Sequence, residues 1–114
     1  MDISVIKRGF AYVGERRVHF RAAGGGPPVV LLHQSPRSSA ELVPLMQVLA
    51  RHFRVIALDH RGHGNGLRSD AGFTLSACAD DVAALVRTLG LGRVIVAGYS
   101  MGGPIAQLVW RRHR

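Results

Sequence analysis

One serine in this chain stands in a setting that suits a reactive nucleophile. A short apolar run at 94–97 leads into Gly98-x-Ser100-x-Gly102, and a helical pattern follows it. This order of strand, Gly-x-Ser-x-Gly and helix is the context of a nucleophile elbow, a sharp turn that presents a serine hydroxyl. Glycine suits both flanking positions because a Cβ there would collide with the strand or with the start of the helix. The pattern therefore favours Ser100 as a nucleophile over its alternative role as a cap of the following helix.

Other residues that could bind a metal or a phosphate lack the partners that such sites need. His60 and His63 lie three apart in a glycine-rich loop, but no further metal ligands stand nearby. The glycines at 24–26 are not followed by the Gly-x-x-x-x-Gly-Lys-Ser/Thr pattern of a phosphate loop. Cys78 is the one cysteine, so it cannot form an internal disulfide and is most simply a core side chain. We expect neither a metal nor a cofactor.

The elements that must position the serine follow from the spacing of apolar residues. Residues 10–14 and 17–23 indicate an antiparallel hairpin, with Val18 and Phe20 facing the core. The alternate positions of the second strand, including His19, are expected on the outer polar face. Continuous apolar runs at 29–32 and 54–58 are typical of strands covered on both faces, and the run before the serine is a further strand. The pattern predicts an α/β fold, with a mostly parallel open sheet and the hairpin at one edge.

Three helices are expected between and after these strands. The first starts near a Ser38/Glu41 capping pair, with Pro44 in an irregular first turn. The second runs from a Thr74 cap to about Leu89, and the third leaves the elbow. The first two helices are predicted to bury stripes that comprise Leu42, Leu45, Met46 and Leu49 in one, and Cys78, Val82, Leu85, Val86 and Leu89 in the other.

Composition narrows the class of protein further. The 114 residues fit one domain, and the formal charge of +8 comes mainly from arginines that are scattered along the chain. No nucleic-acid-binding motif accompanies them, so we expect no nucleic-acid partner. No apolar run approaches the ~20 residues of a membrane span, and residues 1–8 do not resemble a signal peptide. With a single cysteine, a cytoplasmic location is predicted.

The motifs taken together resemble the N-terminal half of the α/β-hydrolase fold. Any one of them alone is weak, but four in the expected order are specific. The resemblance covers the chain from about Phe10 to its end. Its four features are the apolar strand into His33-x-Ser35-Pro36, the loop Asp59-x-Arg61-Gly62-His63-Gly64, the helix and turn from Leu75 to Gly92, and Gly98-Tyr99-Ser100-Met101-Gly102-Gly103.

The resemblance implies a role for each residue near the elbow. Ser100 would attack an acyl carbonyl, and a serine here excludes the branches of the family that use an aspartate. The oxyanion would be bound by two backbone N–H groups, one from Met101 and one from Ser35, with Gln34 as the alternative. Glutamine at 34 is a departure, since the family usually has glycine there.

Two further residues receive structural roles from the resemblance. His33 would hold its loop by hydrogen bonds, and a catalytic-base role is the alternative that we weigh against it. Arg61 would anchor the glycine-rich loop. Gly98 and Gly102 would shape the elbow. None of these residues completes a catalytic triad.

The base and the acid of a triad are missing from the residues after the serine. In this fold they follow the nucleophile, yet residues 101–114 contain no Asp or Glu and only His113. At 1.5 Å per residue along a helix, His113 lies roughly 20 Å from Ser100 and cannot be the base. We expect residues 1–114 to be a partial domain, truncated after the elbow helix, whose elbow strand forms an open sheet edge capable of self-association.

Two classes of function follow. The first is a serine hydrolase that cleaves acyl esters of small molecules through an acyl-enzyme, inactive as this isolated fragment; acyl transfer, perhydrolysis and carbon–carbon hydrolysis use the same elbow. The second is a non-catalytic remnant. A basic binding module is a minor third interpretation, whose sign would be DNA binding that weakens steeply with salt.

Overall fold

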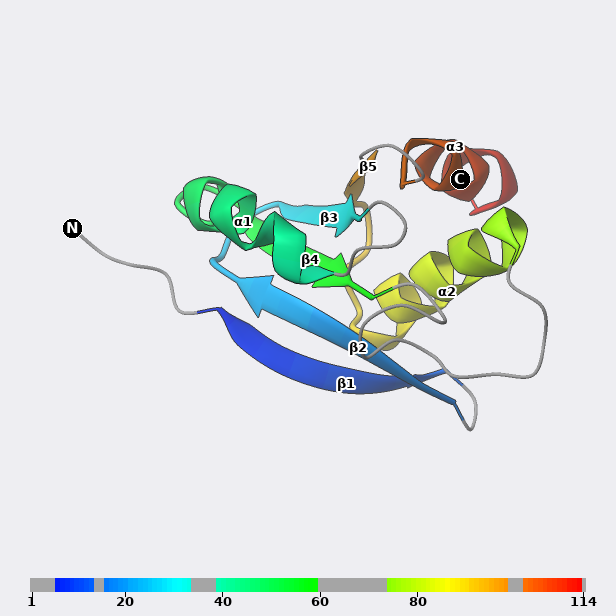
Figure 1. Cartoon of the computed structure of the whole chain (residues 1–114), viewed down its shortest axis with the longest axis horizontal. Helices are drawn as coiled ribbons and strands as arrows, with labels where there is room; N and C mark the ends of the chain where they lie inside the picture. The colour runs from blue at the N-terminus through cyan, green and yellow to red at the C-terminus, as the bar shows by residue number, and fades with distance from the viewer. Residues whose placement is uncertain (1–5, 14–15, 34–38, 60–73, 99–101, 114) are drawn as a thin grey trace.

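The chain folds around one five-stranded sheet. The computed structural model describes residues 6–13, 16–33, 39–59, 74–98 and 102–113. The strands lie in the order β1-β2-β4-β3-β5 (Figure 1). The pairings β1–β2 and β2–β4 are antiparallel, and β4–β3 and β3–β5 are parallel. The predicted α/β fold is confirmed. Its strands are β1 (Lys7–Val13), β2 (Arg16–Ala23), β3 (Pro28–Leu32), β4 (Arg54–Leu58) and β5 (Ile95–Gly98).

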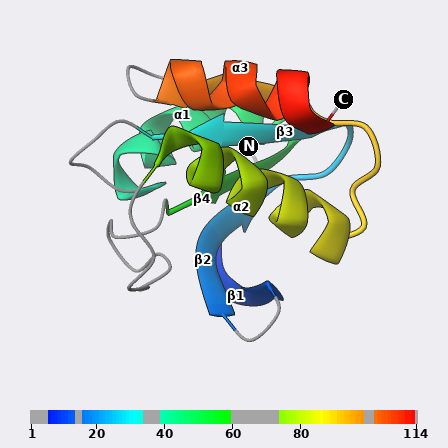
Figure 2. The same ribbon diagram turned by 90° about the vertical axis from the view of Figure 1, so that its right-hand side faces the viewer.

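Helices cover both faces of the sheet, as the apolar runs predicted. The 3₁₀ helix η1 (Ser39–Leu42) and α1 (Val43–Leu49) lie on one face, and α2 (Leu75–Thr88) and α3 (Gly102–His113) lie on the other (Figures 1 and 2). Within the described ranges, no helix combines the length and the apolar character that crossing a membrane requires.

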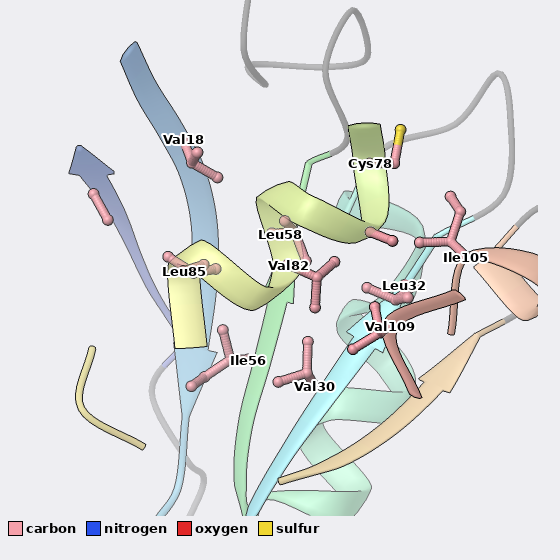
Figure 3. Packing of buried hydrophobic residues seen from close by; sticks show 12 residues of the cluster. Val18, Val30, Leu32, Ile56, Leu58, Cys78, Val82, Leu85, Ile105 and Val109 are labelled. Atoms are coloured by element: carbon pink, nitrogen blue, oxygen red, sulfur yellow. The ribbon is translucent and has the colours of Figure 1, made fainter. Parts of the chain in front are cut away.

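Alternate residues of the central strands enter two separate hydrophobic clusters. Val30 and Leu32 of β3 pack with α2 and α3, whereas Val29 and Leu31 pack with α1. Figure 3 shows the first cluster, in which side chains from β2, β3 and β4 meet those of the two helices. Burial on both faces explains why β3 and β4 are continuous apolar runs rather than alternating ones.

The first helix differs from its prediction at one residue. Leu42 and Met46 are buried and Leu49 is half-buried, but Leu45 is 46% exposed. The prediction for Leu45 is wrong because Ala50, one turn after Met46, completes the buried stripe in its place. Pro44 sits in the first turn of α1, directly after η1, in agreement with the irregular start that we expected.

The second helix agrees with its predicted caps. The Thr74 hydroxyl accepts a hydrogen bond from the Ala77 N–H at 2.9 Å. Gly90 follows the helix with a φ of +66°, the left-handed conformation that ends helices. Cys78, Val82 and Leu85 are buried, and Val86 and Leu89 are half-buried against the same cluster.

Two isoleucines on this sheet provide a matched test of the core. Ile56 of β4 is fully buried, whereas Ile95 of β5 is 57% exposed. We expect Ile56→Ala to lower the free energy of unfolding by about 3 kcal/mol, because it removes buried methylenes and leaves a cavity. Ile95→Ala should cost less than about 1 kcal/mol. Urea unfolding of both variants measures the difference, and equal losses would contradict this description of the core.

Candidate functional site

The predicted elbow lies between the last strand and the last helix. β5 ends at Gly98 and α3 begins at Gly102, so the chain passes from strand to helix within three residues. Ser100 and Met101 lie between these two elements in the sequence, outside the described residues. Their roles stay predictions, and the geometry of the site is built from the residues on either side.

The two glycines of the motif occur where no side chain fits. A Cβ on Gly98 would overlap the carbonyl oxygen of Gly102 and would lie 2.6 Å from the amide nitrogen of Gly103. A Cβ on Gly102 would overlap the carbonyl oxygen of Leu32. These neighbours are backbone atoms, which cannot rotate away as a flexible side chain can. The close approach of strand and helix expected of the elbow is therefore present.

The contact between Gly102 and Leu32 brings a second segment to the elbow. Leu32 is the last residue of β3, and the buried His33 follows it directly. The chain that leaves β3 thus starts beside the N-terminus of α3, where backbone N–H groups favour negative charge. Gln34 and Ser35, the predicted oxyanion donors, and Arg61 lie outside the described residues.

Five polar side chains form a hydrogen-bonded cluster, and we name it the His19–Asp59 cluster: Arg8, His19, Arg21, Ser39 and Asp59. His19, Ser39 and Asp59 are buried, Arg21 is half-buried and Arg8 is exposed. His19 is fully buried and its Nδ1 lies 2.7 Å from Oδ2 of Asp59, which is 2% exposed. The other carboxylate oxygen, Oδ1, accepts the backbone N–H of Ser39 at 2.7 Å. Asp59, the residue directly after β4, therefore connects His19 of β2 to Ser39, the first residue of η1.

Two arginines extend the His19–Asp59 cluster. Arg8 of β1 donates from Nε to Nε2 of His19 at 3.0 Å, and Arg21 of β2 donates to the hydroxyl of Ser39 at 2.6 Å. The prediction that His19 faces outward is wrong, because its partner Asp59 brings a polar side chain into the interior. Sequence analysis missed the pair. The signal that could have found it is an aspartate placed directly after a fully buried strand.

A second histidine–aspartate pair lies at the opposite end of α3. Nε2 of His113 is 2.7 Å from Oδ1 of Asp80 on α2, and Arg112 donates to the same carboxylate at 3.1 Å. Hydrogen bonds from His113 and then Arg112 lower the pKa of Asp80 below its usual value. His113 is the last residue of α3, roughly 16 Å along the helix from Gly102. This pair connects two helices and does not serve the elbow.

The described residues offer no cluster of metal ligands. Among the residues that the structure describes, no three His, Cys, Asp or Glu side chains gather where they could hold a metal ion. His60 and His63 lie outside those residues. Cys78 is buried in the cluster of Figure 3, which agrees with its predicted place in the core.

Comparison with known proteins shows one family throughout. The family profile of the α/β hydrolase fold matches residues 27–113. The 2-(acetamidomethylene)succinate hydrolase of Mesorhizobium japonicum is 38% identical over 90 residues, which are 79% of this chain and 32% of that protein. The soluble epoxide hydrolase of Corynebacterium sp. (strain C12) is 41% identical over 96 residues, which are 84% of this chain and 34% of that protein.

Solved structures agree with these sequence matches. The crystal structure of E-2-(acetamidomethylene)succinate hydrolase superposes with a TM-score of 0.90 at 31% identity, covering 96% of this chain and 41% of that one. The epoxide hydrolase CorEH superposes with a TM-score of 0.85 at 39% identity, covering 90% of this chain and 36% of that one. The chain spans about a third of the length of the curated relatives that it matches.

Proposed function

The chain belongs to the α/β hydrolase fold family, and on that premise we propose that it carries the nucleophile of a serine hydrolase acting on acyl esters of small molecules. Ser100 is the proposed nucleophile. The N–H groups of Met101 and Ser35 are the proposed oxyanion donors, with Gln34 as the alternative to Ser35. His33 and Arg61 are proposed to shape the adjoining loops.

The observation that supports this proposal most is the packing of Gly98 and Gly102. Backbone atoms occupy the space of a Cβ at both positions, so the end of β5 and the start of α3 approach each other closely on either side of residues 99–101. The same packing puts the end of β3 against the start of α3. Backbone N–H groups from two segments can then converge on one point, as stabilisation of an oxyanion requires.

The proposed reaction proceeds in two steps. The Ser100 oxygen bonds to the carbonyl carbon of the ester as its proton passes to a base, and the alcohol leaves when the carbon–oxygen bond breaks and it takes up a proton. Water then attacks the acyl-enzyme and releases the acid and the serine. We propose that residues 101–114 supply neither the base nor the acid that orients it, and that both come from elsewhere.

The names of the relatives do not select one reaction. One is a hydrolase of 2-(acetamidomethylene)succinate and another an epoxide hydrolase, at similar identities to this chain. A serine at position 100 favours acyl chemistry over the aspartate-dependent branches. Acyl transfer, perhydrolysis and carbon–carbon hydrolysis remain alternatives at the same elbow. The proposed setting is the cytoplasm, with no membrane or nucleic-acid partner.

A non-catalytic role is the second candidate. The observation that favours it is the engagement of His113, the one histidine after Ser100, with Asp80 at the far end of α3. Without a base the Ser100 hydroxyl would have the low reactivity of an ordinary serine.

A fluorophosphonate probe tests the proposal on the 114-residue chain. We expect labelling to be very weak, because the one histidine that follows Ser100 in the sequence, His113, is engaged with Asp80 at the far end of α3. Mass spectrometry of the labelled peptide, with Ser100→Ala as the control, measures it. Strong labelling that Ser100→Ala abolishes would show that the chain, or a second copy of it, supplies the base. That result would overturn the proposed need for outside residues.

A further inference from the structure

The His19–Asp59 cluster has a protonation pattern that its hydrogen bonds define. An arginine side chain can only donate, so Nε2 of His19 must accept the hydrogen bond from Nε of Arg8. A ring nitrogen that accepts carries no proton. The proton of His19 therefore sits on Nδ1, which donates to Oδ2 of Asp59 over 2.7 Å. The ring is a neutral connector between a guanidinium and a carboxylate.

The Asp59 carboxylate needs this connector because it is removed from water. Burying a carboxylate costs several kcal/mol unless hydrogen bonds replace its hydration. With Oδ2 bonded to His19, Oδ1 is aimed at the Ser39 N–H at 2.7 Å. The Asp59 N–H also donates to the backbone carbonyl of His19 at 2.9 Å, which aligns β2 with the end of β4. Two contacts thus fix Asp59 relative to β2.

The consequence concerns the segment between β3 and η1. Its start is fixed where Leu32 meets Gly102, and its end is fixed where Ser39 meets Asp59. We propose that His19, in its neutral Nδ1–H form, is a positioning residue that acts through Asp59 to fix Ser39, the residue at which the chain from β3 enters η1. The inference rests on the proposed function only in that this segment contains the proposed oxyanion donor Ser35.

The first test reads the protonation state of His19 without any substitution. Long-range proton–nitrogen correlation spectra of the nitrogen-15-labelled chain at pH 7 distinguish the two ring nitrogens. We expect His19 to show a protonated Nδ1 and an unprotonated Nε2. A protonated Nε2, alone or together with Nδ1, would overturn the proposal. The spectrum of His19→Asn, which lacks the signal, assigns it.

The second test measures how His19 controls Ser39. We expect His19→Leu to speed amide hydrogen exchange at Ser39 about tenfold to a hundredfold relative to the amides of β4, as loss of a hydrogen bond to a charged group would. His19→Asn keeps an N–H donor near the position of Nδ1 and should restore most of the protection. Ser39→Ala keeps the N–H that Asp59 accepts and should leave its exchange within about threefold of wild type.

A control separates positioning from general stability. Val18→Ala removes buried atoms from the neighbouring residue of β2 without touching the cluster. If Ser39 exchanges no faster in His19→Leu than in Val18→Ala, the proposal is wrong. The same holds if His19→Asn behaves like His19→Leu. Failure of Ser100 as a nucleophile would change none of these exchange rates, so the two proposals fail separately.

Discussion

In a form of the protein that contains a catalytic base, replacing Ser100 by alanine is expected to lower the turnover rate by a factor of at least about 10³. Because the base follows the nucleophile in this fold, we expect a chimera to provide one: residues 1–113 of this chain joined to the part of the Mesorhizobium japonicum relative that follows its matched segment. The loss should be this large because no other group can form the acyl-enzyme. The rate of p-nitrophenyl acetate hydrolysis and the rate of fluorophosphonate labelling both measure it.

A second serine variant serves as the control for Ser100→Ala. Ser76→Ala, on α2, removes a hydroxyl from an element outside the elbow and should leave both rates within about twofold of the parent chimera. Activity that survives Ser100→Ala would refute the role of this residue. A chimera that folds, as judged by circular dichroism, but is not labelled would favour the non-catalytic alternative.

Gly98→Ala is expected to destabilise the 114-residue chain by about 3 kcal/mol or more. The new Cβ would overlap the Gly102 carbonyl, and relief would require β5 and α3 to move apart. Gly103→Ala is the matched control one residue into α3, because its Cβ would lie 4.0 Å from the Gly98 carbonyl oxygen, an ordinary van der Waals contact. That variant should be neutral or stabilising by up to about 1 kcal/mol, since alanine favours the helix.

Chemical denaturation of the two glycine variants measures this difference. The unfolding midpoints should separate clearly, with Gly103→Ala at or above the wild-type value. Similar stabilities for Gly98→Ala and Gly103→Ala would show that the close approach of β5 and α3 is not a constraint, and the main support for the elbow would be lost.

Much of the fold could be predicted from the sequence because its signals are local. Continuous apolar runs predicted β3 and β4, and Thr74 and Gly90 predicted the ends of α2, since each signal depends on a few neighbouring residues. The glycines at 98 and 102 likewise predicted that the strand and the helix approach too closely for a Cβ at either position. Leu45 shows the limit: helical spacing alone allows either Leu45 or Ala50 to complete the stripe, and packing on the sheet decides between them.

The His19–Asp59 cluster could not be predicted in the same way. Its central pair joins residues 19 and 59, and no local pattern links positions so far apart in the chain. Alternation along β2 correctly separates His19 from the face of Val18 and Phe20, but it could not reveal that Arg8 and Asp59 contact His19 and that this side chain is fully buried. The reactive turn itself remains a prediction from motif context, supported by the glycines on either side.

The pairing of β3 with β5 also determines when the sheet can be completed during synthesis. Val29 pairs with Ile95, so β3 leaves the ribosome long before its second neighbour exists. At about 5–20 residues per second, the intervening chain takes several seconds to emerge. For that time β3, paired with β4 alone, offers the apolar run Val29–Leu32 along an open edge to any other strand. The nascent chain is therefore most exposed to mispairing before the elbow strand has been made.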